Sequence, residues 1–471
     1  MAIWDEFKKI FGVAPVSMDQ LNRAALKVPP RTQPIIHTIP NIEITPEYKQ
    51  ILDWLNAGAP MVFVTGKAGT GKTTLVQYLR SKFQANTVVV APTGVAALNV
   101  GGTTIHSFFR FPPHLITVRD IKFGRDRKLY TKMRLLIIDE ISMVRVDVID
   151  GMDRFLRMIR QNDQPFGGVQ VLMIGDLFQL PPVVPQPEQA ALEEMGYQSP
   201  WFFSANAFKE CAIMPIELTK VYRQSEAAFI GLLNKVRIAE DIDGLLPIVN
   251  RRCLPVSQSD GLFITLTCTN KVADEINDQQ LKKLQTPAQT FVGEVRGKFI
   301  IEHDKLPSPI NLTLKAGAQV MFTKKDEKGC RWVNGTLGKV VEIANGIIRV
   351  EVDGAYAKAT YDVSLAKWES YKYVYDEELD AIIAVTTGYY LQYPLMLAWA
   401  VTIHKSQGKT LEKVRIDLGH GAFDSGQVYV ALSRCRTLDN VFLTKPIQKQ
   451  DIKCAPIIKR FYAALFPGQE R

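Results

Sequence analysis

The sequence MVFVTGKAGTGKTT at residues 61–74 decides the fold of this chain. Its apolar run, 61–64, predicts a buried parallel strand, and a helix is expected from Thr73 to Arg80. A glycine-rich turn between strand and helix can curl around phosphates and point N–H groups at them, and the helix N-terminus adds its positive dipole. A chance turn can match the pattern, but the flanking strand and helix favour a nucleotide site.

The side chains of this loop have separate expected roles. Lys72 should reach the β- and γ-phosphates, and the Thr73 hydroxyl should ligate Mg²⁺. Further contacts to the nucleotide are expected from Gly66, Ala68, Gly69, Thr70, Gly71 and Thr74. ATP and Mg²⁺ are therefore the expected cofactors.

Polar residues also follow two later apolar runs. Residues 135–138 lead into Asp139-Glu140, and a run ending at residue 174 leads into Gly175-Asp176 and then Gln179. Acidic pairs usually lie on solvated surfaces, but acids at the carboxyl end of a parallel strand lie in the crevice where α/β sheets bind ligands. We expect Asp139 to hold Mg²⁺, Glu140 to orient or deprotonate the attacking water, and Gln179 to contact the γ-phosphate.

Two arginines lie in later segments, which belong to an expected second α/β region of the chain. Arg223 belongs to Tyr-Arg-Gln at 222–224, and Arg434 ends Tyr-Val-Ala-Leu-Ser-Arg at 429–434. A guanidinium aimed across a cleft at a γ-phosphate is an arginine finger, which stabilises charge when two lobes close. The alternative is a surface ion pair, and the sequence context favours the finger more for Arg434.

Composition limits the function classes. The chain has 471 residues, a formal net charge of +9 and a pI near 9.0, which suit several domains and a polyanionic partner without demonstrating one. No apolar stretch is long enough to span a bilayer, and the first residues lack a signal or transit pattern. The six cysteines are scattered without a Cys-x-x-Cys pair, so reduced thiols and no structural metal are expected.

The pattern of strands, helices and turns divides the chain. Apolar strands alternate with helical stretches in two regions, as in open parallel sheets, and short alternating runs with Asn-Gly turns between them predict a small antiparallel barrel or sandwich. The expected parts are an N-terminal extension (1–45), a first lobe (46–218) with an insertion at about 104–131, a second lobe (219–310 and 396–471), and the barrel (311–395).

Several motifs together resemble one family. The discriminating stretch runs from Glu-Ile-Ser-Met at 140–143, through 155–160 and Gln-Pro-Phe-Gly-Gly at 164–168, to Gly-Asp-Leu-Phe-Gln-Leu-Pro-Pro at 175–182. With residues 402–408 and 430–436, it resembles the petite-integration-frequency (PIF) DNA helicases of superfamily 1B, relatives of the RecD-like helicases. The likeness covers about residues 60–445.

This resemblance implies a fold and an activity. The fold is α/β, with two RecA-like P-loop lobes, a small wedge insertion in the first and an SH3-like β-barrel inserted in the second. The activity is ATP-dependent 5′-to-3′ translocation on single-stranded DNA, with unwinding of duplexes, DNA–RNA hybrids and, as a further option, G-quadruplexes. A monomer or a DNA-induced dimer acting in DNA repair, recombination and genome maintenance is expected, with no membrane partner.

The resemblance also implies nucleic-acid contacts. Short polar groups can grip phosphates, and an aromatic ring can stack on a base, although a histidine or phenylalanine in such a cluster is as often core. The matching positions are Pro92, Thr93, Gly94, His106, Ser107, Phe108, Thr269, Asn270, Trp332, Asn334, Thr402, His404 and Lys405.

Recognition of the adenine base is the least certain match to the family pattern. Gln50 lies near the family's adenine-recognising glutamine but is offset by about one residue, so that Tyr48 or Lys49 could align instead. Tyr222 is a candidate for stacking on the base, with simple packing as the alternative. Gly408 completes the expected nucleotide contacts.

Two other functions compete with a helicase. A nucleotide-regulated DNA-binding subunit of a recombination or repair complex need not retain Lys72, Glu140, Arg223 and Arg434 together. An RNA helicase is disfavoured by the stretch at 140–182, and no spare acidic cluster suggests a nuclease. The expected location is the cytoplasm of a bacterium or phage-infected cell, or the nucleus or mitochondrion if the source is eukaryotic.

Overall fold

The first lobe is built on a parallel sheet. The computed structural model describes residues 42–83, 85–122, 126–254, 261–299, 306–326, 331–353 and 358–467, so the expected N-terminal extension lies almost wholly outside them. Six strands have the order β3-β2-β4-β5-β1-β6, and all pairs are parallel. Their bounds are β1 Met61–Gly66, β2 Thr87–Ala91, β3 Thr103–Thr104, β4 Leu135–Ile138, β5 Gln170–Ile174 and β6 Met214–Leu218.

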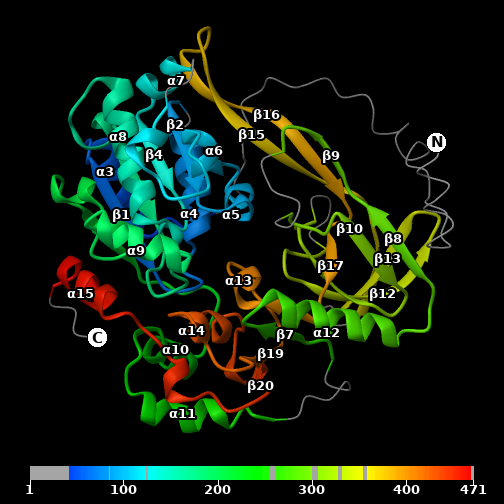
Figure 1. The fold of residues 1–471 in the computed structure, drawn as a ribbon. Helices are drawn as coiled ribbons and strands as arrows, with labels where there is room; N and C mark the ends of the chain where they lie inside the picture. Colours follow the sequence, from blue (N-terminus) through cyan, green and yellow to red (C-terminus); the bar gives the residue numbers. More distant parts are fainter. Residues whose placement is uncertain are drawn as a thin grey trace.

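Helices cover both faces of this sheet, which is why its strands are apolar throughout (Figure 1). Val62 and Val64 of β1 pack with helices α3 and α4, whereas Phe63 faces the core under α8. The bounds are α3 Pro46–Asn56, α4 Lys72–Lys82, α5 Gly94–Asn99, α6 Ile105–Phe109, α7 Arg127–Lys132, α8 Val146–Arg160 and α9 Gln186–Glu194.

The second lobe has a smaller parallel sheet. Its four strands have the order β18-β7-β19-β20, with all pairs parallel. The strands are β7 Ile264–Thr267, β18 Ala400–Thr402, β19 Val414–Asp417 and β20 Val441–Leu443, and the helices are α10 Ala227–Ile238, α11 Ile242–Asn250, α12 Asn270–Lys283, α13 Ile403–Ser406 and α14 Gln427–Leu432. Because β7 and β18 are neighbours in this sheet and α12 packs on both, the chain between the end of α12 and β18 is an insertion.

That insertion contains the antiparallel barrel. A five-stranded sheet, β14-β13-β12-β11-β17, packs around its own apolar core. Residues 288–297, which the sequence division left in the second lobe, form β8 and β9 and pair with strands of the insertion. The bounds are β8 Ala288–Val292, β9 Glu294–Gly297, β10 Asn311–Lys315, β11 Gln319–Phe322, β12 Leu337–Ala344, β13 Ile347–Asp353, β14 Lys358–Val363 and β17 Leu395–Leu397.

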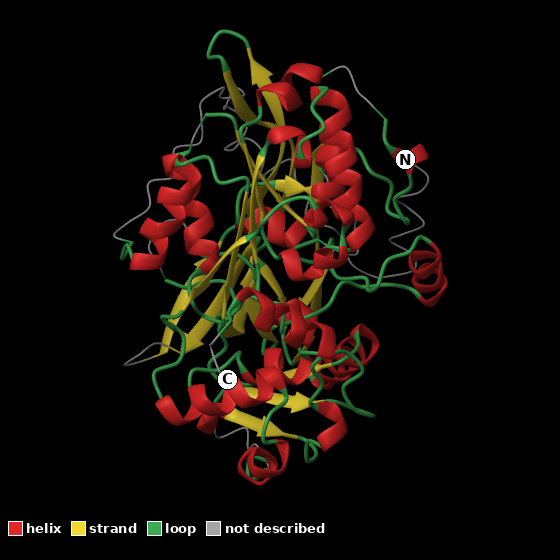
Figure 2. Ribbon diagram, turned by 90° about the vertical axis from the view of Figure 1, so that its left-hand side faces the viewer, coloured by secondary structure: helices red, strands yellow, loops and turns green. Residues whose placement is uncertain are grey.

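A long hairpin extends from the barrel to the first lobe. Strands β15 (Ala366–Asp376) and β16 (Ala381–Gln392) pair along their whole length, and Figure 2 shows their tip projecting beside the helices of the first lobe. The backbone N–H of Val89 donates to the Tyr373 hydroxyl at 3.1 Å, and the Tyr373 ring packs edge-on against Phe108. The alternating runs predicted a barrel but not this contact.

The C-terminal helix departs from the expected division. Residues 396–471 were assigned to the second lobe, but α15 (Pro456–Leu465) packs on the first (Figure 1). Phe461 stacks on Phe203 with ring centroids 4.2 Å apart, and Tyr462 meets Phe178 edge-on. Its apolar face therefore completes the core of the first lobe. Among the described residues, no helix is both long and apolar enough to cross a membrane.

Candidate nucleotide and nucleic-acid site

The loop between β1 and α4 has the backbone that phosphate binding needs. Gly69 and Gly71 have φ values of +84° and +85°, a region that glycine adopts without a steric penalty. A Cβ at Gly69 would lie 2.5 Å from the Cβ of Arg223, and one at Gly71 would lie 3.1 Å from the Tyr48 hydroxyl. These glycines therefore serve both the curvature of the loop and the close approach of its neighbours.

Lys72 begins α4 and points into the loop. Its Nζ donates to the carbonyl oxygens of Gly66 at 2.7 Å and Lys67 at 3.1 Å. Burial lowers the pKa of Lys72, while the nearby carboxylates of Asp176 and Glu140 favour its charged form. An ammonium group held among acids in a loop of N–H donors is suited to a polyphosphate ligand.

The two acids after β4 differ in backbone and surroundings. Burial, and then the neighbouring Glu140, raise the pKa of Asp139 to about 7. Glu140 has a φ of +50°, and its partly buried carboxylate accepts a hydrogen bond from Gln407 Nε2 at 3.2 Å. The same Gln407 nitrogen lies 3.2 Å from Gln179 Oε1, so a second-lobe side chain joins two expected catalytic groups.

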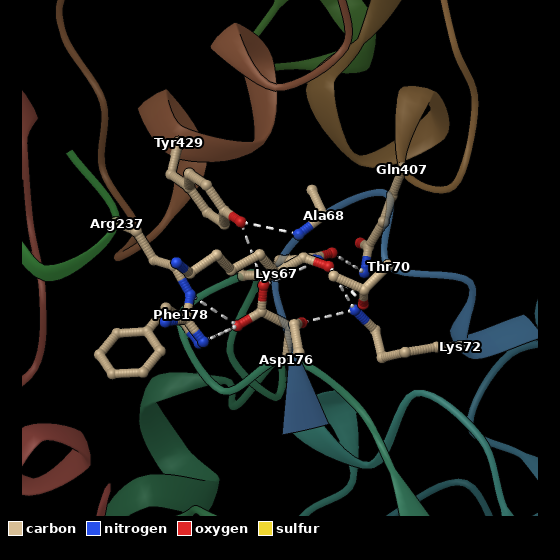
Figure 3. A network of polar contacts seen from close by, with 11 residues as sticks. Lys67, Ala68, Thr70, Lys72, Asp176, Phe178, Arg237, Gln407 and Tyr429 are labelled. Carbon is tan, nitrogen blue, oxygen red and sulfur yellow. Dashed lines mark hydrogen bonds and ion pairs between the residues drawn. The ribbon is translucent and has the colours of Figure 1, made fainter. Parts of the chain in front are cut away.

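A buried polar network extends from the loop into the second lobe (Figure 3). The carboxylate of Asp176, just after β5, pairs with Arg237 of α10 at 3.0 Å. Tyr429 of α14 donates to the other Asp176 oxygen at 3.3 Å and accepts the N–H of Ala68 at 2.9 Å. The phosphate loop and the second lobe are therefore hydrogen-bonded directly.

The two expected arginine fingers lie at this junction. Arg223 donates to Thr410 Oγ1 at 3.0 Å and to the Ser433 carbonyl oxygen at 3.2 Å, and the N–H of Tyr222 donates to Gly69. Arg434 is 1% exposed and donates to backbone oxygens of its own lobe, including Val430 at 2.7 Å. Burial, and then the charge of Arg223, lower the pKa of Arg434 to about 9. The buried guanidinium of Arg434 and the partly buried one of Arg223 together create a positive potential that suits an anion.

The expected base-binding residues lie around Gly71 and the second lobe. The Tyr48 hydroxyl donates to the Gly71 carbonyl oxygen at 3.0 Å, and the half-exposed ring of Tyr222 flanks the same glycine. Gln50 is exposed on α3, two residues after the buried Tyr48 and therefore not on the same face of the helix. Gly408 is also exposed, and its carbonyl oxygen accepts from Arg223 at 3.4 Å.

The expected nucleic-acid residues begin helices after four strands of the two sheets. Thr93 caps α5, Thr104 caps α6 and Thr402 caps α13, each through its side-chain oxygen, and Thr269 precedes α12 without such a bond. Thr93, Ser107, Thr269, Asn270 and Lys405 are exposed, while Pro92, Gly94, His106, Asn334 and His404 are partly buried. Burial is the main cause that lowers the pKa of His106 and of His404, which favours neutral imidazoles.

With this geometry in place, comparison with known proteins is informative. The family model described as "PIF1-like helicase" matches residues 43–250. A solved structure, Bacteroides sp Pif1 in complex with ADP-AlF4, is 38% identical, with a TM-score of 0.82 over 90% of this chain and 97% of that one.

This chain belongs to the PIF1-like helicase family.

Other relatives give the extent of the match. The curated Xenopus laevis "ATP-dependent DNA helicase PIF1" is 31% identical over 92% of this chain, which spans 66% of that protein's length. The Bacteroides Pif1 structure bound to ssDNA is 39% identical, with a TM-score of 0.65 over 90% of this chain and 97% of that one. The expected family and the α/β fold class are thus confirmed.

Two aromatic residues expected to contact DNA are packed in apolar clusters. Phe108 is 6% exposed and packs edge-on against Phe109, Tyr130 and Tyr373, so its ring is not free to stack on a base. Trp332 is also 6% exposed and stacks on Phe322 with centroids 4.3 Å apart. Thr402 is buried as well, and its hydroxyl is used in capping α13. The PIF1-like motif context raised the expectation for these aromatic rings, but apolar packing decided their positions.

Sequence analysis also missed functional candidates. Asp176 and Gln407 lie inside motifs that the sequence analysis quotes. The available signal for Asp176 was its position after an apolar strand, and for Gln407 its position in the same motif as His404. Arg237 lies in α10 outside any quoted motif, and an arginine in an apolar helix, AAFIGLLNKVRI, was its only signal. Tyr429 begins a quoted motif but had no assigned role. All four become visible only when the lobes are brought together.

Proposed function

We propose that this protein is an ATP-dependent DNA helicase that moves 5′ to 3′ along single-stranded DNA. One observation carries the proposal: side chains from two separate parallel sheets converge on one phosphate loop. Lys72 and Glu140 come from the first lobe, and Gln407 and the two arginines from the second. Such an arrangement makes hydrolysis depend on how the lobes meet, which is what a motor requires.

Asp139 and Thr73 fit a magnesium ion bound with the nucleotide. Asp139 directly follows β4 and has a buried carboxylate, and Thr73 is exposed at the start of α4 beside the loop. Oxygen ligands of this kind, completed by phosphates and water, suit Mg²⁺. The ion would neutralise charge on the phosphates.

The remaining groups have roles that follow from their positions. Lys72 holds the β- and γ-phosphates, and Glu140 orients the attacking water and takes its proton. Gln407 holds Glu140, and Gln179, to which Gln407 also donates, contacts the γ-phosphate. Arg223 and Arg434 stabilise the charge that develops in the transition state, and their approach requires closed lobes.

Helix starts in both lobes are proposed to grip the strand. Thr93 and Ser107 on the first lobe, and Thr269, Asn270 and Lys405 on the second, expose short polar or basic groups. Alternating grip by two lobes, closed by ATP and reopened by hydrolysis, gives directed movement. Contacts to phosphates make binding salt-sensitive and largely independent of sequence.

The proposed substrates are single-stranded DNA with duplex junctions, DNA–RNA hybrids and G-quadruplexes. The Bacteroides Pif1 structure bound to ssDNA supports the first of these. We propose that the protein acts as a monomer or as a dimer formed on DNA. Its proposed location is the cytoplasm of a bacterium or phage-infected cell, or the nucleus or mitochondrion if the source is eukaryotic.

Strand separation on two matched duplexes tests this function. One duplex carries a 5′ single-stranded tail and the other a 3′ tail, with Lys72→Ala as the control. Opening of only the 5′-tailed duplex, lost in the variant, is the expected result. DNA-stimulated ATPase without opening of either would indicate a DNA-binding subunit, and preference for the 3′ tail would contradict the polarity.

A further inference from the structure

The hydroxyl of Tyr429 lies between the two lobes. It belongs to the first turn of α14, is buried, and accepts the N–H of Ala68 in the phosphate loop at 2.9 Å (Figure 3). The start of the same helix touches the first lobe again, since a Cβ at Gly426 would lie 2.3 Å from the Gln179 carbonyl oxygen. Helix α14 is therefore seated on the nucleotide site.

The Asp176 carboxylate fixes the direction of this hydrogen-bond chain. Burial and the negative charge of Asp176 raise the pKa of Tyr429, whereas Arg237 and Lys72 hold the pKa of Asp176 below its usual value despite burial. Tyr429 is thus the protonated partner: it donates to Asp176 at 3.3 Å, and its lone pair faces the Ala68 N–H. A phenylalanine at 429 would remove both bonds.

Arg237 holds the carboxylate from the opposite side. Its Nε and Nη2 lie 3.2 Å and 3.0 Å from one Asp176 oxygen, and its guanidinium lies 4.1 Å from the Phe178 ring centroid. Tyr462 of α15 packs on the same guanidinium at 5.6 Å. The Arg237 guanidinium, enclosed by these groups, has few alternative positions. The Asp176 carboxylate that it holds therefore keeps its second oxygen in a fixed position for Tyr429.

Helix α14 connects this anchor to Arg434. The Arg434 Nε donates to the carbonyl oxygen of Val430, the residue after Tyr429, at 2.7 Å. Its Nη1 donates to the carbonyl oxygens of Ser406 and Lys409 at 3.2 Å each, and these two residues flank Gln407 in the chain. Helix α14 therefore links the contact of Tyr429 with the loop to Arg434, which the segment after α13 also holds.

We propose that Tyr429, fixed by Asp176 and Arg237, is a positioning residue that sets Arg434 against the phosphate loop. The inference rests on the proposed ATP hydrolysis. It adds that these contacts set the rate of hydrolysis and not the affinity for the nucleotide. Arg237 belongs to the device because it holds the carboxylate to which Tyr429 donates.

Two tyrosine-to-phenylalanine variants test this role. Tyr197 is the matched control, since its hydroxyl also donates to a buried aspartate, Asp150, at 2.9 Å, but outside the nucleotide site. In the full chain with single-stranded DNA, Tyr429→Phe should lower kcat about 10- to 100-fold, as displacement of a catalytic group by up to about 1 Å does. KM for ATP and binding of a fluorescent ADP analogue should stay within about twofold, because these report ground-state binding.

A double variant separates positioning from a general structural effect. If Tyr429 acts through Arg434, adding Tyr429→Phe to Arg434→Lys should lower kcat little beyond the loss in Arg434→Lys alone. Arg237→Lys should give a kcat loss in the same direction as Tyr429→Phe. Additive losses, an unchanged kcat in Tyr429→Phe, or an equal loss in Tyr197→Phe would each overturn the role, whereas a wild-type chain without ATPase would overturn the proposed function itself.

Discussion

The two parallel sheets of this protein follow one plan and carry different chemistry. In the first, β1 runs into the glycine loop, and β4 and β5 lead into Asp139 and Asp176. In the second, no described strand leads into such a loop, and the strand ends lead instead into Thr269 and Thr402 at helix starts. The first sheet builds a nucleotide site, while the second supplies side chains that complete it.

The sheets are alike in the surface proposed to meet DNA. β2 leads into Thr93 and β3 into Thr104, as β7 and β18 do into their threonines. The two sheets therefore differ at the proposed nucleotide site, where only the first carries a glycine loop, and resemble each other at the surface proposed to bind DNA. Four experiments, with five substitutions in all besides the controls, test this comparison.

Arg434→Lys should give the largest effect. It keeps a positive charge but loses the planar fork, so kcat for ATP should fall roughly 10³-fold, within the range seen for arginine fingers. Binding of a fluorescent ADP analogue should be preserved, because the first sheet holds the nucleotide. Loss of nucleotide binding together with kcat would contradict the division of labour between the sheets.

Lys72→Ala should give the next largest effect. Removing a preorganised cation from the phosphates should lower kcat about 10²- to 10³-fold. Unlike Arg434→Lys, it should also weaken nucleotide binding, measured by titration of the same analogue. The unfolding temperature of the variant is the control for a loss of folding. An unaltered nucleotide affinity would show that residues other than Lys72 hold the nucleotide.

Thr93→Val and Thr269→Val test the equivalence of the two DNA-facing edges. Each removes an exposed hydroxyl at a helix start, and each should weaken binding of a fluorescent oligothymidylate about 2- to 10-fold, the equivalent of one net hydrogen bond. Thr290→Val, which removes a surface contact to Thr313 on the barrel, is the control. A loss confined to one lobe would show that the edges are not equivalent.

Gln50→Ala should give the smallest effect. The side chain is exposed on α3, so its loss should raise KM for ATP only about two- to threefold and leave KM for GTP unchanged. Gln189→Ala on the exposed surface of α9 is the control. Equal changes for both nucleotides would remove Gln50 from adenine recognition and leave Tyr48 and Tyr222 as the candidates.

Local motifs predicted much of the nucleotide site. The glycine loop, Lys72 and the acids after β4 are encoded by short segments whose strand and helix context is visible in the sequence, and each takes the expected position at a strand end. The barrel strands were equally visible as alternating runs. Such features depend on neighbours within a few residues, so a linear pattern suffices.

Other features depended on partners distant in the chain. The sequence does not show that Tyr373 packs on Phe108, which was expected to stack on a base, or that Phe322 packs on Trp332, which was expected near DNA. The C-terminal α15 was assigned to the wrong lobe because an amphipathic helix does not encode which core it covers.

Ordered motifs were enough to predict the family and the α/β class and to name the residues proposed to meet the phosphates, because these features follow from local backbone geometry. Only the tertiary structure decided that Arg237, Gln407 and Tyr429 join the site and that the hairpin β15–β16 reaches the first lobe. The physical reason is that a buried charge or hydroxyl is stable only beside its partner, and these partners lie up to 361 residues apart in the chain.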